Sequence, residues 1–242
     1  MSVRVQTIPP FDLDRVKLVS RQLWDQKLNG SGKFERFADT PSGISPMSLP
    51  GMKDGQYVAE GLEHLPSGEP DYTPEMHSAN MFKRGRKIRE AAADAEAWGM
   101  LERFGDQNAP VAILGWGSTI GPVREAVDRA QAEGMPVAVL YTKMIHPLPR
   151  KEIAEFIETR KEIIVPEMNY TGQFARMIQA EFWREVISVR KYGGVPFATH
   201  EIYAEIKKAY AKLGKPAPKK STAPKRIAKS TQKKIAPKKN RK

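Results

Sequence analysis

From residue 110 onward, short continuous apolar runs alternate regularly with amphipathic stretches. Apolar runs of this length bounded by turn residues are typical of buried strands, whereas apolar residues spaced three and four apart indicate helices. Four strands are predicted, at residues 110–117, 135–143, 161–168 and 186–193. Four helices are predicted between and after them, at residues 120–134, 149–160, 172–185 and 198–213.

The order of these elements predicts the fold class. Helices that follow each strand are typical of an α/β protein with an open, mainly parallel sheet and helices on both faces. Strands that are apolar throughout fit a sheet that is buried on both sides. We therefore expect one compact α/β domain over residues 110–213.

The pattern is less regular before residue 110. Residues 12–28, within an N-terminal segment of residues 1–33, are amphipathic and favour a helix. Residues 34–80 are rich in Pro, Gly and Ser and predict a loop with short extended pieces. Its interleaved aromatic and aliphatic residues favour docking over disorder. Residues 81–105 are rich in Ala, Lys, Arg and Glu, which predicts a helix.

The formal net charge of +12 is confined to one end of the chain. Residues 214–242 contain ten Lys, two Arg and no acidic residue, and the other 28 basic residues are balanced by 28 acidic ones. A segment this polar and charged is expected to be disordered. It suits contact with a polyanion such as nucleic acid, although it has no aromatic residue to stack on bases, and the alternative is a solubilising extension.

Composition excludes several classes of site. The chain has no cysteine, which excludes disulfides, thiol catalysis and cysteine-ligated zinc or iron–sulfur clusters within it. No apolar run approaches the roughly 20 residues needed to cross a bilayer, and residues 1–14 show no signal-peptide pattern, so a cytoplasmic location is expected. No metal site is expected from the histidines, which are scattered: His64, His77, His146 and His200.

A glycine-rich turn joins the first predicted strand to the following helix. Gly115, Gly117 and Gly121 have the spacing G-x-G-x-x-x-G, whereas a dinucleotide fingerprint has G-x-G-x-x-G and an acidic residue after the second strand. The second strand here ends without an acid, so a tight packed turn is favoured over NAD binding. Ser118 and Thr119 are candidates to cap the helix, and an anion at its N-terminus is the alternative.

A second cluster of polar residues follows the third predicted strand, in the stretch IIVPEMNYTGQFARMIQAEFW (163–183). The carboxyl ends of parallel strands are where such sheets bind ligands. Asn169 or Thr171 is expected to cap the next helix, and Gly172 permits close approach of another group. Glu167 and Tyr170 lie beside them, and the pattern leaves helix capping, a ligand site and an interface open.

The segment VPEMNYTGQFARMI resembles a signature near the end of the α-subunit of 2-oxoacid:ferredoxin oxidoreductases, especially the 2-oxoglutarate type. Three further blocks agree in order, and the resemblance covers roughly residues 34–205. FADTPSGISPMSLPGM (37–52) is similar to a loop of the type T-x-D-G-I-S-P-x-x-x-P-G, with Pro41 and Ser42 at positions often occupied by Glu and Asp. The other blocks are YVAEGLEHLPSGEP with MHSANMFKRGRKI, and GWGSTIGPVREAV with HPLP.

The resemblance implies an oxidoreductase that uses thiamine diphosphate, Mg²⁺, CoA and iron–sulfur clusters to convert a 2-oxoacid to an acyl-CoA and to reduce ferredoxin. Residues 110–213 would be the transketolase C-terminal-like domain. Residues 34–109 would be a remnant of the pyrimidine-binding domain with its loop and linker helix. Because the chain has no cysteine, the clusters would lie in another chain. The implied partners are a β-subunit, a chain carrying the missing α segment and, through the complex, ferredoxin, with no membrane contact.

The sequence departs from the family pattern in ways that bear on catalysis. The family's upstream Y-P-I-T-P motif and the glutamate that activates the cofactor have no counterpart here. We therefore expect a subunit or subunit fragment that is not catalytic alone, whether a split-gene product, a truncation or a repurposed domain. The alternative is a non-catalytic interaction protein whose tail binds a polyanion. No catalytic residue is assigned, and the binding or interface candidates in the two motif groups are Asp39, Gly43, Ser45, Pro46, Glu167, Asn169, Tyr170, Thr171 and Gly172.

Overall fold

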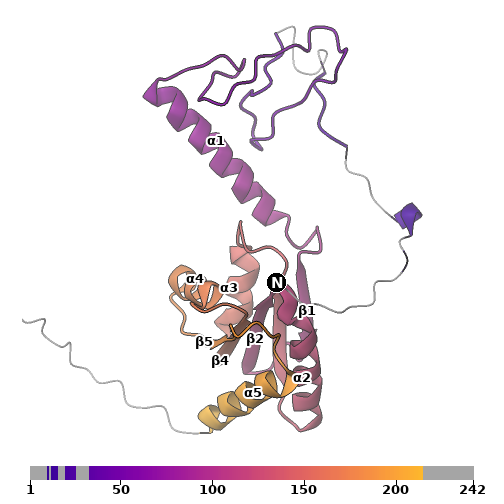
Figure 1. Cartoon of the computed structure of the whole chain (residues 1–242), viewed down its shortest axis with the longest axis vertical. Coiled ribbons are helices and arrows are strands. Elements are labelled where there is room, and N and C mark those ends of the chain that lie inside the picture. Colours follow the sequence, from indigo (N-terminus) through magenta and orange to yellow (C-terminus); the bar gives the residue numbers. More distant parts are fainter. Residues whose placement is uncertain (1–9, 11, 16–19, 26–32, 215–242) are drawn as a thin grey trace, which may run out of the picture.

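The computed structural model of the chain describes residues 10, 12–15, 20–25 and 33–214. Of the expected basic tail at residues 214–242, residues 215–242 lie outside the described residues, as does much of the N-terminal segment. Within the described part, no helix is long and apolar enough to cross a membrane. The molecule consists of a loop-rich head, a long helix and a sheet domain (Figure 1).

The sheet domain, residues 101–213, contains five strands in the order β1-β3-β2-β4-β5. All neighbouring strands are parallel except β1, which pairs antiparallel with β3. This confirms the expected open, mainly parallel sheet. The strands are β1 Leu101–Gly105, β2 Val111–Trp116, β3 Val137–Thr142, β4 Glu162–Glu167 and β5 Ile187–Arg190.

Helices cover both faces of the sheet, as the pattern predicted. Alternate side chains of β2 point to opposite faces, so Val111 and Ile113 pack in one core and Ala112 and Leu114 in the other. The first core includes α2 and α5, and the second includes α3 and α4. The helices are α2 Ile120–Ala132, α3 Arg150–Glu158, α4 Gln173–Phe182 and α5 Thr199–Leu213.

The helix that precedes the sheet, α1, spans Pro74–Ala93. The prediction of a helix over residues 81–105 is therefore wrong at both ends. The helix begins early because the Thr73 hydroxyl accepts a hydrogen bond from Met76 N and Pro74 occupies the first turn, which is a favourable start. The last part of the predicted helix is instead strand β1, which lies at the edge of the sheet.

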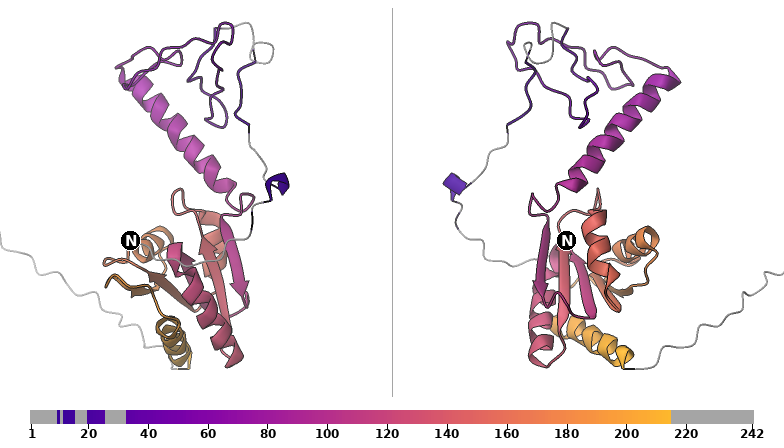
Figure 2. Two further views of the ribbon diagram at one scale, coloured as in Figure 1. Left: turned by 45° about the vertical axis from the view of Figure 1, so that its right-hand side comes forward. Right: turned by 180° about the vertical axis from the view of Figure 1, so that it is seen from behind.

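The head comprises residues 20–25 and 33–73, and its loop docks on the N-terminal half of α1 (Figure 2). Asn80 of α1 is buried and donates to Glu63 Oε2 at 2.7 Å and to the His64 carbonyl at 3.0 Å. The Lys83 ammonium donates to the Phe37 carbonyl and to Ser45 Oγ. The expected docking of residues 34–80 is thus what the structure shows.

A single helix over residues 12–28 is not what the structure shows in the described residues. Leu13–Arg15 form one 3₁₀ turn, and residues 20–25 are extended. Trp24 N donates to the Met47 carbonyl at 2.9 Å, and the Trp24 ring packs against Phe34 with centroids 5.1 Å apart. Burial of Trp24 in the head therefore overrides the helical periodicity.

Candidate functional site

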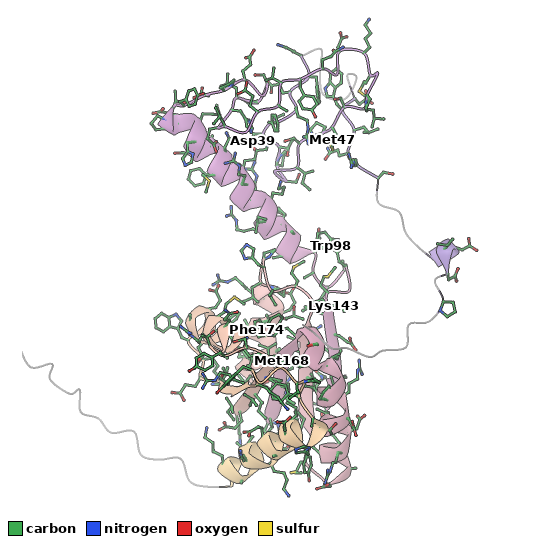
Figure 3. All side chains as sticks on the ribbon, viewed as in Figure 1. Asp39, Met47, Trp98, Lys143, Met168 and Phe174 are labelled. Atoms are coloured by element: carbon green, nitrogen blue, oxygen red, sulfur yellow. The ribbon has the colours of Figure 1, made fainter. Side chains whose placement is uncertain are left out.

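The two polar clusters predicted from the sequence meet at the carboxyl edge of the sheet. β2 and β4 are neighbouring parallel strands, so the turns that follow them lie together. Ser118 Oγ, after β2, lies 3.6 Å from Met168 Sδ, after β4. This edge is the place where open α/β sheets bind ligands, and Figure 3 shows Lys143, Met168 and Phe174 in the sheet domain, away from the head.

Glu167 is the last residue of β4, and its side chain is completely buried. Its Oε2 accepts hydrogen bonds from Asn169 Nδ2 at 2.5 Å and from Phe174 N at 2.9 Å, while Oε1 accepts from Ala175 N at 3.0 Å. A buried carboxylate is tolerated when it is fully hydrogen-bonded, and the positive end of a helix dipole favours it further. Glu167 therefore anchors the start of α4, and both oxygens are already engaged.

Asn169 provides the second anchor of α4. Its Oδ1 accepts from Gly172 N at 2.7 Å and from Gln173 N at 3.2 Å, which satisfies amides at the start of the helix. Of the two capping candidates, the structure thus selects Asn169. Thr171 makes no such bond, and its side chain is exposed. The sequence left helix capping open for the whole cluster, and the structure shows that Glu167 joins this cap.

Gly172 has a structural reason to be glycine. Its φ is +66°, in the left-handed region, and an added Cβ would lie 2.7 Å from Ser188 Oγ and 3.2 Å from Arg190 Cδ. Both the backbone conformation and the lack of space exclude a side chain here. The close approach predicted at Gly172 is therefore an approach of β5, within the same domain.

The glycine turn after β2 is packed in the way that the sequence favoured. A Cβ at Gly115 would lie 2.8 Å from the Tyr141 ring, and Gly117 has a φ of +67°. The prediction that Ser118 or Thr119 caps α2 is wrong, because neither side chain accepts from the helix amides. The 3₁₀ turn Gly117–Thr119 runs directly into α2, and the Thr119 hydroxyl instead donates back to the Trp116 carbonyl at 3.0 Å.

A cavity of about 1000 Å³ opens above this turn. Its walls come from the ends of β2 and β3, the first turn of α2 and the residues before α5. Lys143 lines it and donates to the Gly99 carbonyl at 3.2 Å, and Arg124 lines it while paired with Glu102. Gly121 also lines it, and an added Cβ there would meet nothing within 4 Å. The cavity is open, partly basic and suited to binding rather than to acid–base catalysis.

Lys143 and Arg124 were not selected as site residues from the sequence. A signal for Lys143 was present, because the residue after a parallel strand lies at the edge where ligands bind. Arg124 gave no signal, since one arginine on an amphipathic helix is usually a solvated surface residue. Its role in the cavity wall follows from the pairing of β1 with β3, which brings Glu102 alongside α2.

The candidates in the head are not part of this site. Figure 3 shows Asp39 and Met47 in the head, well away from Lys143, Met168 and Phe174. Asp39 pairs with Arg86 of α1, and a Cβ at Gly43 would lie 2.8 Å from the Lys83 carbonyl. Ser45 Oγ accepts from Lys83, whose pKa is lowered mainly by burial and is partly restored by Asp39. Pro46 is buried nearby. This group attaches the loop to α1.

Tyr170 lies at the rim of the sheet edge and is 67% exposed. Its ring makes an edge contact with Tyr192, which follows β5, with centroids 4.8 Å apart. Arg190 donates to the Tyr170 carbonyl at 3.1 Å. Tyr192 was not singled out from the sequence, and only the pairing of β4 with β5 brings it to Tyr170. Two exposed tyrosines in contact are typical of a binding or interface surface.

Comparison with known proteins agrees with the fold and the motifs. A family model described as pyruvate:ferredoxin oxidoreductase core domain II matches residues 109–202. The α-subunit of 2-oxoacid:ferredoxin oxidoreductase 2 from Aeropyrum pernix is 30% identical over 202 residues, which are 82% of this chain and 30% of that protein. The 2-oxoglutarate oxidoreductase subunit KorA from Mycobacterium tuberculosis is 31% identical over 168 residues, or 68% of this chain and 24% of that protein.

A solved structure is also similar. The 2-oxoglutarate:ferredoxin oxidoreductase from Magnetococcus marinus, with 2-oxoglutarate, coenzyme A and succinyl-CoA bound, superposes with a TM-score of 0.76 and 35% identity. The match covers 84% of this chain and 34% of that one, so the chain spans about a third of the length of its relatives or less. Its sequence motifs, its sheet and these matches together show that the chain is similar to one portion of the α-subunits of 2-oxoacid:ferredoxin oxidoreductases.

Proposed function

We propose that this chain is one part of a thiamine-diphosphate-dependent 2-oxoglutarate:ferredoxin oxidoreductase and is not catalytic alone. The whole assembly would convert 2-oxoglutarate and CoA to succinyl-CoA, with reduction of ferredoxin. The observation that carries the proposal is the similarity to the Magnetococcus marinus enzyme, which extends over 84% of this chain at 35% identity. The required partners are a β-subunit and a chain that supplies the rest of the α-subunit.

We assign no cofactor site to the described residues. They contain no group of three or more His, Asp or Glu side chains that could hold a metal ion. The buried carboxylate at the sheet edge, Glu167, is committed to the start of α4. No cysteine is available for an iron–sulfur cluster. We therefore assign the chemistry to partner chains and derive no catalytic step from this one.

Within such an assembly, the sheet edge would be the contributed surface. The cavity between β2, β3 and α2 offers Lys143 and the glycine turn, and the adjacent loop offers Tyr170. Asn169 and Glu167 would act as positioning residues, because they fix the loop that carries Tyr170. Thr171 is exposed in the same loop and is available for contact.

The test is reconstitution. The purified chain is supplied with 2-oxoglutarate, CoA, thiamine diphosphate, Mg²⁺ and methyl viologen, alone and after co-expression with a β-subunit and a chain that carries the remaining α segment. We expect dye reduction only with the partners, and more with 2-oxoglutarate than with pyruvate. Robust turnover by the isolated chain would refute the role as an incomplete subunit.

The basic tail favours a second role, contact with a polyanion. Residues 214–242 carry the entire net charge of +12, and such segments bind phosphate backbones through counterion release. The full chain is expected to be retained on heparin with a steep salt dependence, and a chain without residues 214–242 is expected to elute early. Equal retention of the two proteins would rule out this role.

A further inference from the structure

Helix α1 is sparsely covered by the other described residues. It is 20 residues long, yet the only residue with a buried side chain in it is Asn80, which faces the head. Most amphipathic helices of soluble domains bury a continuous face. Here Met81 is 54% exposed and Phe82 is 73% exposed. A helix this open is expected to be covered by something else in the working protein.

The exposed apolar side chains of α1 and the small residues between them form one stripe along the helix. Most of them recur at intervals of three and four residues, so they share one side of the helix, which is turned away from the side that bonds to the head through Asn80 and Lys83. Both views in Figure 2 show α1 as an oblique arm between the head and the sheet domain. We define the α1 stripe as Ser78, Met81, Phe82, Gly85, Ile88 and Ala92.

The composition of the α1 stripe suits a second helix. Gly85, Ser78 and Ala92 are small and permit close approach of another helix axis, whereas Phe82, Met81 and Ile88 provide apolar area. An added Cβ at Gly85 would meet only the end of the Arg89 side chain, at 3.4 Å, so the fold of the chain itself leaves this spot open. Phe82 has the largest apolar side chain of the stripe, so its burial would contribute most.

The α1 stripe continues into a hollow at its C-terminal end. A cavity of about 660 Å³ lies between the end of α1 and the sheet domain. Arg89 and Ala92 line it from α1, and Leu148 and Met177 line it from the sheet domain. A helix lying along α1 could therefore extend to the sheet domain and contact both parts of the molecule.

The charge of α1 indicates which kind of helix would bind to it. α1 has five basic residues between Lys83 and Arg89, and no acidic residue between Met76 and Arg89. Arg84 and Arg86 pair with acids of the head, but no ion pair of the described residues involves Arg89, which lies within the stripe's face. A second copy of α1 crossing at Gly85 would bring two such basic clusters together, which is unfavourable.

We propose that the α1 stripe binds an amphipathic helix of another polypeptide, with an apolar face flanked by carboxylates. Glu or Asp side chains beside that face would pair with Arg89, and its apolar side chains would cover Met81, Phe82 and Ile88. The inference rests on the proposed role as one part of a larger assembly, and it names the surface through which another part attaches.

The test uses two synthetic helical peptides that share one Leu/Ala face, with Glu at the flanking positions in one and Lys in the other. Binding to the full chain is followed by fluorescence anisotropy. We expect the Glu peptide to bind at least tenfold more tightly than the Lys peptide. The double variant Phe82→Glu/Ile88→Glu should lose at least tenfold in affinity for the Glu peptide, whereas Trp183→Glu, at a 94% exposed site elsewhere, should not.

The contrary outcomes are distinct. Equal affinity for both peptides, no binding of either, or no effect of the double variant would overturn the proposal. A dimer of the chain in sedimentation that the double variant dissociates would show that a second copy covers the α1 stripe, which also overturns it. Circular dichroism checks that the variants fold. Because the readout is binding and not turnover, failure of the oxidoreductase assignment would be seen separately, in the reconstitution.

Discussion

The sheet domain and the head are built in opposite ways. The sheet domain buries two continuous cores, one on each face of the sheet, with most core side chains fully excluded from water. The head buries few large side chains, chiefly Trp24 and Phe34, and is held to α1 by hydrogen bonds and ion pairs. The sheet domain thus has enough buried core to fold alone. The head depends on α1 and leaves much apolar surface exposed for a partner.

Gly172→Val should have the largest effect, about 4 kcal/mol of unfolding free energy, because it combines a left-handed backbone with a contact of 2.7 Å. Urea unfolding followed by circular dichroism measures it. Gly121→Ala, where an added Cβ meets nothing, is the matched control and should be neutral or slightly stabilising. If Gly172→Val kept normal stability but prevented assembly, the glycine would serve an interface and not the packing of the sheet domain.

Glu167→Ala should destabilise the sheet domain by about 2–3 kcal/mol, since it leaves the amides of Phe174 and Ala175 without their acceptors. The same unfolding experiment applies. Glu158→Ala, at an exposed position near the end of α3, should change stability by less than about 0.5 kcal/mol. Equal effects of the two substitutions would contradict the anchoring role of Glu167.

Asn80→Ala should loosen the head without unfolding the sheet domain. The substitution removes two hydrogen bonds that join α1 to residues 63–64, a local loss of about 1–2 kcal/mol. Hydrogen exchange should then accelerate in residues 33–73 and stay unchanged in β2, β3 and β4. Acceleration throughout the chain would show that the two regions form one cooperative unit.

The smallest effect expected concerns Glu201, at the start of α5. Hydrogen bonds from Lys191 and from the Ala198 amide hold its pKa below the ordinary value of 4.5. Its contribution is present above that value and is lost as the pH falls through the lower pKa of the folded state. The stability difference between the protein and Glu201→Gln, under about 1 kcal/mol at pH 7, should therefore shrink below pH 4.5. A stability difference that grew as the pH fell below 4.5 would contradict the lowered pKa of Glu201.

The sequence predicted the sheet domain well because its strands are buried runs with no competing pattern. Strand β1 was not predicted, because it lies at the edge of the sheet, where Glu102 and Arg103 can remain solvated. Its sequence therefore fits a helix as well as a strand. The start of α1 was missed although Thr73 and Pro74 are a favourable signal, because the preceding loop is also rich in proline. These errors occur where local composition fits two structures.

The candidate site was predicted in pieces. The residues of both turns were selected, but only the strand order places β4 beside β2, and no local pattern contains that order. The capping role of Glu167 also depends on tertiary structure, because the direction of β4 places the buried Glu167 side chain against the first turn of α4. The pattern could show that polar groups gather at strand ends, and the packing showed which of them hold the fold together.

The short turn between α1 and β1 has a mechanical consequence. The backbone amide of Lys143 donates to the Met100 carbonyl at 2.8 Å and its ammonium donates to the Gly99 carbonyl at 3.2 Å, so the turn that follows α1 is attached to the end of β3. A helix of 20 residues is about 30 Å long, and a rotation of 10° at its root would displace the far end by about 5 Å. Lys143 lines the cavity and also holds the turn from which α1 extends to the head, so a change at the cavity wall would be magnified at the far end of the helix.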